Sequence, residues 1–188
     1  MEKKPFKKSF FFFGITIFVI LFDQVSKTLI YHSFFLGESL PIGGDFFKIT
    51  YILNPGGAFG TKLGGNNFYT FLSLVAIVLT FIFFFQTKKN QFLVKIGLAL
   101  VLGGAIGNLI DRFRFGQVID FLDFDFFDIK ISPFNWGFIN FPGFYLDRWP
   151  VFNLADSSVS IGVFLIILQM LLPKKHSSTS TGNVLPEV

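Results

Sequence analysis

The sequence contains no cysteine and only two histidines among its 188 residues. The absence of cysteine excludes disulfides, a thiolate nucleophile and a cysteine-ligated metal site. His32 follows a long apolar segment and His176 lies in a polar tail, so the two histidines lack the ligand spacing of a zinc site. We therefore expect no metal site. Charged residues are also scarce, at 15%, and the net charge of +4 is too small to indicate a nucleic-acid partner.

Apolar residues are abundant: they make up 52% of the chain, and 31 residues are phenylalanine. A helix that spans a bilayer needs about 20 apolar residues, and four stretches of the chain approach this length. The sequence therefore predicts an integral membrane protein, mainly α-helical, with one domain over 1–175 and a disordered polar tail over 176–188. The expected transmembrane segments lie at about 10–31, 68–86, 93–110 and 152–172.

Two of these segments have unusual features. The first follows a basic N-terminus as a signal peptide would, but its apolar run is too long and no cleavage site follows, so we interpret it as a retained anchor. The third contains glycines that dilute its hydropathy and are typical of helices that pack closely against neighbours. These glycines are Gly97, Gly103, Gly104 and Gly107.

The lysines predict the orientation of the chain in the membrane. They cluster at the N-terminus, between the second and third segments, and after the fourth segment. The positive-inside rule then places both termini in the cytoplasm. The long connections, at about 32–67 and 111–151, are expected on the outer side. Alternation of apolar and polar residues at 48–53 predicts a strand in a small extracytoplasmic β-rich region.

Two aspartates lie beside long apolar segments: Asp120 ends the stretch GQVID, and Asp156 lies within FNLADSSVSIG. A carboxylate near a membrane is unfavourable unless it is paired, hydrated or used in chemistry. Two aspartates that share a proton can activate water and protonate a leaving group. The apolar neighbours of Asp120 predict a raised pKa for its carboxyl group. The simpler interpretation of Asp156 or Asn153 is a helix N-cap.

Other polar residues permit both a structural and a functional interpretation. Asp23 and Lys27 are spaced i, i+4 and are expected to form an ion pair that orients the first helix. Asn54 precedes Pro55 and Gly56 in a turn, where its amide is suited to bind a peptide backbone. The outer end of the third segment carries an amide and two charges that mark either a site or the membrane–water boundary: Asn108, Asp111 and Arg112.

A serine nucleophile is a weaker alternative. Ser157 and Ser158 have no histidine nearby in the sequence. A Ser–Lys dyad needs Lys27, which already has Asp23 as a partner, or Lys130, which lies in a long loop. The two aspartates are therefore the preferred catalytic candidates.

Four blocks, taken in order, resemble the lipoprotein signal peptidase (signal peptidase II) family of bacteria: FDQVSK, NPGGAFG, GGAIGNLIDRFRFGQVIDF and FNLADSSVSIG. The resemblance implies an aspartyl endopeptidase of the cytoplasmic (inner) membrane, without a cofactor. Such enzymes cleave diacylglyceryl-modified prolipoproteins before the lipidated cysteine, at the outer face. We expect the bilayer and these substrates as partners, and a monomeric protein.

The resemblance also implies roles for individual residues. Asp120 and Asp156 match the catalytic pair, one ionised to take a proton from water and the other protonated to donate one. Asn54 and Asn153 are expected to hold the substrate backbone, and Arg112 to fix the loop that carries the pair. The positions expected to bind substrate or support the pair are Asn54, Gly56, Asn108, Asp111, Arg112 and Asn153.

Two departures from the family pattern stand out. Gly57 occupies a position where the family usually has alanine, and the stretch between the two candidate aspartates is unusually long. That stretch offers rival carboxylates outside any matching motif, at Asp123, Asp125, Asp128 and Asp147. We interpret Asp147 and the adjacent Arg148 as a loop ion pair. The many aromatic residues predict a flap or collar at the membrane interface, which aromatic side chains prefer.

The main alternative function is a small transporter or proton-conducting subunit that uses membrane carboxylates. That alternative predicts carboxylates near the middle of the bilayer, whereas Asp120 and Asp156 lie at the outer ends of their segments. A non-catalytic scaffold leaves the clustered Asn, Asp and Arg residues unexplained. The pattern therefore favours hydrolysis at the membrane surface.

Overall fold

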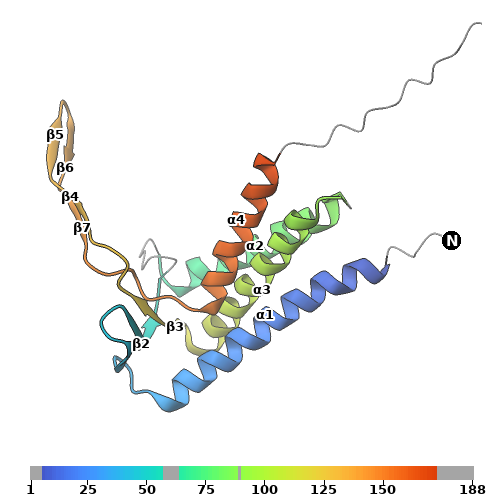
Figure 1. Cartoon of the computed structure of the whole chain (residues 1–188), viewed down its shortest axis with the longest axis horizontal. Helices are drawn as coiled ribbons and strands as arrows, with labels where there is room; N and C mark the ends of the chain where they lie inside the picture. Colours follow the sequence, from blue (N-terminus) through green and yellow to red (C-terminus); the bar gives the residue numbers. More distant parts are fainter. Residues whose placement is uncertain (1–5, 57–63, 89, 173–188) are drawn as a thin grey trace, which may run out of the picture.

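Four long helices form the membrane-spanning part of the protein (Figure 1). The computed structural model describes residues 6–56, 64–88 and 90–172. Within these ranges the helices are α1 (Phe6–Ser33), α2 (Asn66–Gln86), α3 (Phe92–Phe115) and α4 (Leu154–Leu171). All four contain a stretch that is long and apolar enough to cross a membrane. The expected fold class, mainly helical with four transmembrane helices and small sheets, is confirmed. The predicted tail at 176–188 and Gly57 lie outside the described residues.

The end of α3 differs from the prediction. The helix continues to Phe115, so Asp111 and Arg112 lie in its last turns and the following loop begins at Gly116. The helix can include a buried aspartate because Lys27 of α1 neutralises it, with 2.8 Å between the Lys27 Nζ and Asp111 Oδ2 atoms. Gly116 then ends the helix in a left-handed conformation, with φ of 70°, which glycine adopts without steric cost.

The start of α4 also differs from the prediction. The helix begins at Leu154, and Asn153 is its N-cap. Phe152, which was expected inside the helix, instead forms backbone hydrogen bonds with Leu122 in both directions, at 2.7 and 3.0 Å. These bonds hold the chain in an extended conformation immediately before the helix.

Helix α3 lies at the centre of the bundle and packs against the other three helices. The glycines of α3 make this close packing possible, as the sequence predicted. A Cβ atom at Gly97 would lie 2.5 Å from the carbonyl oxygen of Gly162 in α4, and one at Gly103 would lie 2.7 Å from the Cβ atom of Val19 in α1. Added methyl groups at these positions would therefore push the helices apart.

We expect Gly97→Ala to destabilise the protein by about 1–3 kcal/mol, because overpacking a close contact forces backbone shifts. Gly14→Ala is the matched control: Gly14 lies in α1 with no atom near its Cβ position, so alanine there should be neutral or stabilising by about 0.5–1 kcal/mol. Thermal unfolding in detergent measures both. Equal melting temperatures for the two variants would contradict the proposed close packing.

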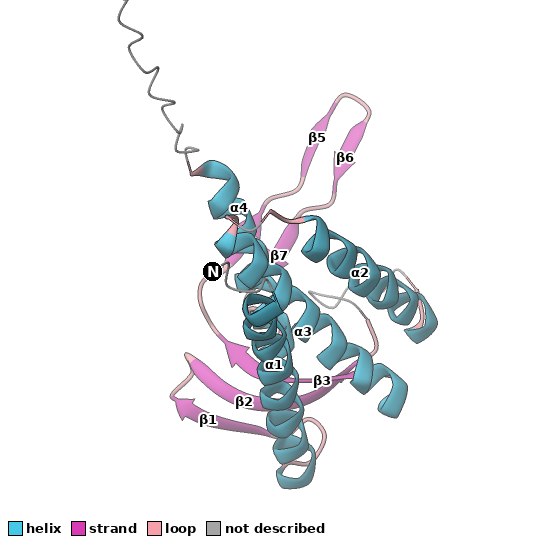
Figure 2. Ribbon diagram, turned by 90° about the vertical axis from the view of Figure 1, so that its right-hand side faces the viewer, coloured by secondary structure: helices cyan, strands magenta, loops and turns pink. Residues whose placement is uncertain are grey.

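A three-stranded antiparallel sheet covers one end of the helix bundle, which we call the sheet end (Figure 2). Its strands are β1 (Ser39–Gly43), β2 (Phe47–Asn54) and β3 (Val118–Phe124), in the order β1-β2-β3. The strand predicted at 48–53 is therefore confirmed. A hydrophobic cluster joins the sheet to α1: Ile30 of the helix packs with Tyr51, Ile119 and Phe121 of the strands. This cluster fixes β3, and with it Asp120, relative to the bundle.

The long stretch before α4 forms a ribbon of short strands rather than an irregular loop. β4 (Ile129–Ile131) pairs with β7 (Phe144–Leu146), and further out β5 (Phe134–Trp136) pairs with β6 (Ile139–Phe141). Figure 1 shows the ribbon starting at the sheet end and diverging from α4 as it rises. We call residues 125–147 the hairpin extension.

The base of the hairpin extension is held by Arg148, but not in the way the sequence suggested. The Arg148 Nε atom donates to Asp123 at 2.6 Å, and its NH1 atom donates to Asp125 at 3.4 Å. Among the described residues these two aspartates are its ion-pair partners. The predicted pair with Asp147 is wrong: Arg148 lies in a bend after β7, and its guanidinium group pairs with Asp123 and Asp125 instead.

Candidate active site

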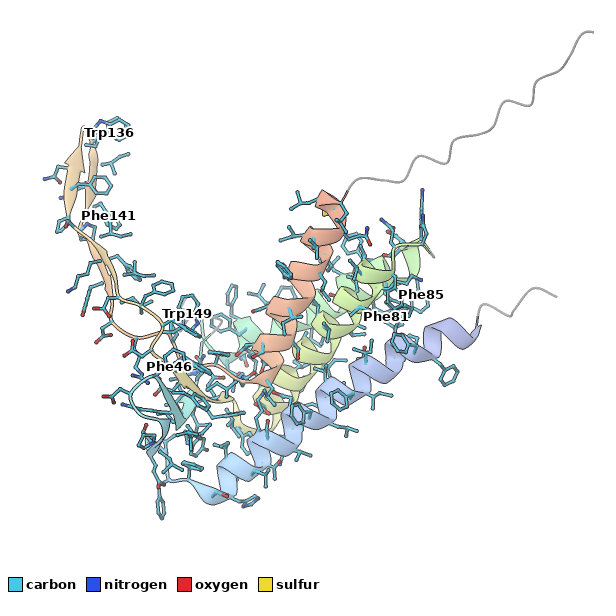
Figure 3. All side chains as sticks on the ribbon, viewed as in Figure 1. Phe46, Phe81, Phe85, Trp136, Phe141 and Trp149 are labelled. Atoms are coloured by element: carbon cyan, nitrogen blue, oxygen red, sulfur yellow. The ribbon has the colours of Figure 1, made fainter. Side chains whose placement is uncertain are left out.

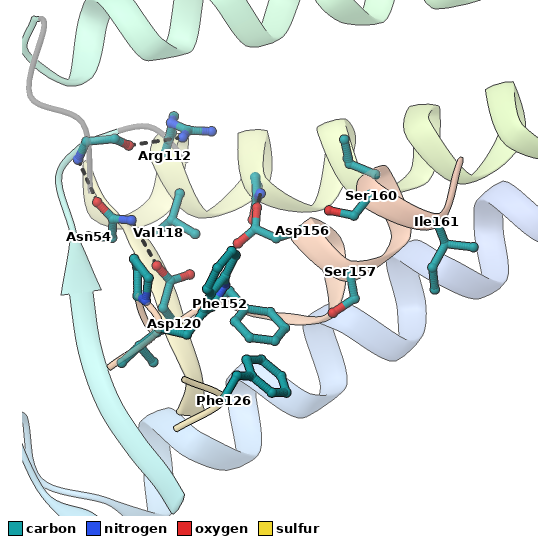
Figure 4. A pocket seen from close by; sticks show the side chains of 16 residues that line it. Asn54, Arg112, Val118, Asp120, Phe126, Phe152, Asp156, Ser157, Ser160 and Ile161 are labelled. Atoms are coloured by element: carbon teal, nitrogen blue, oxygen red, sulfur yellow. Dashed lines mark hydrogen bonds between the residues drawn. The ribbon is translucent and has the colours of Figure 1, made fainter. Parts of the chain in front are cut away.

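Asp120 and Asp156 line one cavity of about 390 Å³ at the junction of the sheet and the helices. Asp120 is contributed by β3, and Asp156 by the first turn of α4. Figure 4 shows both carboxylates turned into this cavity, with Arg112 of α3 above them. The structure therefore brings together two aspartates that are far apart in the sequence.

The carboxylate of Asp120 is held between two amide groups. The Asn153 Nδ2 atom donates to Asp120 Oδ1 at 2.6 Å, and the Asn54 Nδ2 atom donates to Asp120 Oδ2 at 2.9 Å. Only 1% of Asp120 is exposed. Burial, and next the negative charge of Asp156, raise the pKa of Asp120 to about 7, although the two amide donors oppose this shift. The predicted rise is confirmed, and desolvation is its main cause.

The position of Asp156 follows from the way α4 begins. Asn153 is the N-cap: its side chain accepts a hydrogen bond from the Asp156 backbone, while the Asp156 Oδ2 atom accepts from the Asn153 backbone at 3.4 Å. This reciprocal arrangement is a capping box. The other carboxylate oxygen of Asp156 accepts from Asn108 Nδ2 at 2.8 Å. Asp156 is therefore part of the helix cap, at the third position of the capping box, and it also lines the cavity.

Asn54 and Asn153, which the sequence suggested as residues that bind the substrate backbone, form hydrogen bonds with protein groups in this structure. The Asn54 Oδ1 atom accepts from the Gly56 backbone at 2.9 Å, which orients its amide group toward Asp120. Asn153 is fully buried, and its Nδ2 atom also approaches Asn108 Oδ1 at 3.1 Å. Their amides therefore position the Asp120 carboxylate.

Behind the cavity lies a buried cluster of charges centred on Lys27. The Lys27 Nζ atom lies 2.9 Å from Asp23 Oδ2, 2.8 Å from Asp111 Oδ2 and 2.8 Å from Asn108 Oδ1. The expected Asp23–Lys27 pair is confirmed, and Asp111 is a second partner. Through Asn108 this cluster extends to Asp156. Lys27 therefore lies one hydrogen-bonded residue away from a candidate catalytic group.

The two acidic members of this cluster also hold neighbouring backbone. The Asp23 Oδ1 atom accepts from the Ala155 backbone at 3.0 Å, beside Asp156. The Asp111 Oδ2 atom accepts from the Ile119 backbone at 3.2 Å, beside Asp120. Each carboxylate of the cluster thus fixes the residue next to one of the candidate pair.

Arg112 connects three parts of the site. Its NH1 atom donates to Ser73 of α2 at 3.1 Å, and its NH2 atom approaches the Gly56 carbonyl oxygen at 3.4 Å. The guanidinium group therefore contacts the turn that follows β2, next to Asn54, and it adds positive charge to the cavity wall. The sequence predicted that Arg112 lies near the two aspartates, and in the structure it lines the same cavity.

The rival carboxylates and serines have structural partners or lie outside the cavity. Asp123 accepts hydrogen bonds from Thr50 and Arg148. The Ser157 hydroxyl donates to the Asn153 carbonyl oxygen at 2.9 Å, within the first turn of α4. Ser157 therefore contributes to the cavity wall but is engaged with the backbone. No group of three or more potential metal ligands occurs within the part of the chain that the structure describes.

Sequence reasoning missed several contributors. Gln24 donates to Asp111 at 2.9 Å and to the Gly107 carbonyl oxygen at 3.1 Å, and so extends the buried cluster. An amide inside an apolar helix is itself a signal of a buried polar site. Phe126 and Trp149 line the cavity from the hairpin side. Nothing in the local sequence distinguishes these two from the other aromatic residues.

Known proteins are similar to this chain in sequence and in fold. Residues 15–172 match the family model of signal peptidase (SPase) II. The lipoprotein signal peptidase of Syntrophus aciditrophicus (strain SB) is 40% identical over 178 residues, which cover 92% of this chain and 99% of that protein. That of Staphylococcus carnosus (strain TM300) is 34% identical over 175 residues, covering 93% and 98%. The solved structure of a bacterial membrane enzyme aligns with a TM-score of 0.72 at 30% identity, covering 99% of both chains. The chain therefore belongs to the signal peptidase II family, whose members are membrane proteases that remove signal peptides from lipoproteins.

Proposed function

We propose that Asp120 and Asp156 are the catalytic pair, and that they hydrolyse the peptide bond before the lipidated cysteine of diacylglyceryl-modified prolipoproteins. The observation that carries this proposal is the opening of both carboxylates into one cavity. Each has its own amide partners, Asn54 and Asn153 for Asp120, and Asn108 for Asp156. The two groups are thus held in different environments, as an acid and a base require.

In the proposed mechanism Asp120 carries the proton and Asp156 is ionised. A pKa of about 7 leaves much of Asp120 protonated at neutral pH. Asp156 lies in the first turn of α4, where the helix dipole favours a negative charge. Asp156 takes a proton from water as the water attacks the scissile carbonyl carbon. Asp120 donates its proton to the carbonyl oxygen, which forms a neutral tetrahedral intermediate.

The second step reverses the roles of the pair. Asp156 returns its proton to the nitrogen of the cysteine as the peptide bond breaks. Asp120 recovers its proton from the intermediate, and the signal peptide leaves as a carboxylic acid. The pair is then in its starting protonation state, so no metal ion or cofactor is needed in this scheme.

The walls of the cavity suit a substrate that arrives from the lipid. Val159 and Ile161 of α4 line it together with Phe126 and Trp149. Ile161 is 53% exposed on the surface of a membrane-spanning helix. Acyl chains attached to the cysteine can therefore stay in the bilayer while the peptide reaches the aspartates.

We further propose that this single domain, over 1–175, resides as a monomer in the cytoplasmic membrane with both termini in the cytoplasm. Lysines gathered near the ends of the helices opposite the sheet support this orientation. The sheet end and the active site then face outward. This side matches the location of the lipidated cysteine of an exported prolipoprotein.

The proposed substrate class is tested with synthetic peptides and purified protein in detergent or lipid. We expect cleavage of a diacylglyceryl-modified prolipoprotein peptide before the modified cysteine. The matched control is the same peptide with an unmodified cysteine, which should be cleaved much more slowly. Equal rates for the two peptides, or cleavage at another bond, would overturn the proposed specificity.

A pH profile tests the role of Asp120. Because its pKa is raised to about 7, the proton needed for catalysis is present below that pH and lost above it. We expect kcat/KM to fall by about tenfold per pH unit on the alkaline side, as for the loss of one essential proton. Asn54→Ala removes a hydrogen bond that stabilises the ionised form, so the alkaline limb should move to higher pH. A limb that stays in place or moves to lower pH would contradict this assignment.

A further inference from the structure

The tip of the hairpin extension is an uncharged aromatic surface that the proposed chemistry does not use. From Ser132 to Gly143 the sequence contains no acidic or basic residue. Phe138 is fully exposed and Trp136 is 77% exposed. The other large side chains of the tip are also at least partly exposed, namely Phe134, Ile139 and Phe141. An exposed aromatic group of this kind in water is unusual and marks a binding surface.

Charged residues occur only toward the base of the same extension. Asp128 and Lys130 lie on the outgoing side and Asp147 on the returning side. The Lys130 Nζ atom lies 4.9 Å from the ring centroid of Tyr145, so this pair marks the boundary between the charged base and the uncharged tip. A segment that is charged at one end and aromatic at the other suits a water–lipid boundary.

The direction of the extension determines what the tip can reach. In Figures 1 and 2 the ribbon starts at the sheet end, near the first turn of α4, and rises on the same side of the sheet as that helix while diverging from it. Figure 3 shows Trp136 at the far end of the ribbon and Trp149 at its base, beside the sheet. Because α4 crosses the membrane from the sheet end, the tip is turned back toward the bilayer.

The backbone limits how deep the tip can lie. β5 and β6 form a two-stranded sheet, so each strand has one edge without a neighbouring strand. Unpaired backbone groups are very unfavourable in the hydrocarbon core. The headgroup region still supplies water for these groups while it accommodates the aromatic rings. A two-stranded ribbon is also only marginally stable alone in water, so this environment would stabilise it.

We propose that the tip, residues 132–143, binds the lipid interface of the leaflet on the sheet side, as a membrane contact separate from the four helices. This contact fixes the far end of a ribbon whose base contributes Phe126 to the cavity wall. We infer that the tip binds lipid rather than a protein. The four helices already place the protein in a bilayer, and the tip carries no charge that would select a protein partner. The proposal does not depend on the catalytic role of Asp120 and Asp156.

Tryptophan fluorescence tests this contact, because the chain contains two tryptophans. Trp149→Phe leaves Trp136 as the sole reporter, and Trp136→Phe leaves Trp149 as the reference. Each variant is placed in phosphatidylcholine vesicles with bromine at shallow or deep acyl positions. We expect blue-shifted Trp136 emission that shallow bromines quench more than deep ones, at a depth of about 5–10 Å below the headgroups. Acrylamide should quench Trp136 less than it quenches a tryptophan in water.

A charged tip provides the control. Phe138→Asp, made in the Trp149→Phe background, changes a fully exposed side chain, so the fold should persist by circular dichroism. We expect this variant to lose the quenching by brominated lipid and to gain quenching by acrylamide. If brominated lipid does not quench Trp136 in the Trp149→Phe protein, the proposal is overturned. Trp136 emission that varies with the protein-to-lipid ratio would also overturn it, because such emission indicates contact with a second copy of the protein.

Discussion

Replacing either Asp120 or Asp156 by asparagine is expected to reduce signal-peptide removal by about 10²–10⁴-fold or more, the contribution of a positioned acid or base. Asparagine has nearly the same shape as aspartate but can neither donate a carboxyl proton nor accept one from water. Both aspartates line the cavity, so each substitution changes one of the two proposed reacting groups directly. Rates are measured with purified protein and a diacylglyceryl-modified peptide.

The control for this prediction is Asp147→Asn, in the hairpin extension. Asp147 is exposed and lies outside the cavity, so the rate should stay within about twofold of the parent, as expected for a surface substitution. Ser157→Ala tests the alternative nucleophile, since Ser157 lines the same cavity. A larger loss for Ser157→Ala than for the two aspartate variants would contradict the aspartyl mechanism.

Lys27→Met is expected to produce the largest loss of stability, by about 3–5 kcal/mol, because it leaves buried carboxylates without their cation. Lys27 is 1% exposed and contacts both Asp23 and Asp111. Since those carboxylates fix the backbone beside the proposed catalytic pair, activity should fall as well. Thermal unfolding in detergent and the cleavage rate of the folded fraction measure the two effects.

Lys48→Met is the matched control, because Lys48 pairs with an exposed aspartate, Asp45, at 2.8 Å. An ion pair in solvent contributes little to stability, so this variant should unfold near the parent temperature. Asp23→Asn should give an intermediate loss, mainly through stability. A Lys27→Met protein as stable as the Lys48→Met control would rule out a structural role for the buried cluster.

The membrane part of the fold could be predicted because spanning a bilayer requires long apolar runs, which the sequence displays directly. The helix ends were less predictable. Considered without its partners, Asp111 indicates the end of the membrane segment. It lies within α3 because Lys27 neutralises its charge. That contact joins residues far apart in the chain, and local hydropathy carries no information about it. The same reason explains why Phe152 was assigned to α4 although it pairs with Leu122.

The candidate site shows a similar division. The residue types and the four sequence blocks identified Asp120, Asp156, Asn108 and Asn153 as candidate site residues. They did not predict the hydrogen bonds that join these residues. The Asn153 side chain donates from Nδ2 to Asp120, and its Oδ1 atom accepts from the Asp156 backbone and so caps α4. This double role depends on how β3 and α4 meet in three dimensions. The hairpin extension was expected as a loop, because strands of three residues are too short to give a periodic pattern.

The most direct test of the central claim measures substrate binding and single-turnover cleavage on the same preparations of the parent, Asp120→Asn and Asp156→Asn proteins. If the pair performs the chemistry, both variants should bind the diacylglyceryl-modified peptide with a Kd within about tenfold of the parent, or 1.4 kcal/mol, and release almost no product. Product formation by either variant at a rate near that of the parent would contradict the account. So would a loss of cleavage that is explained entirely by lost binding.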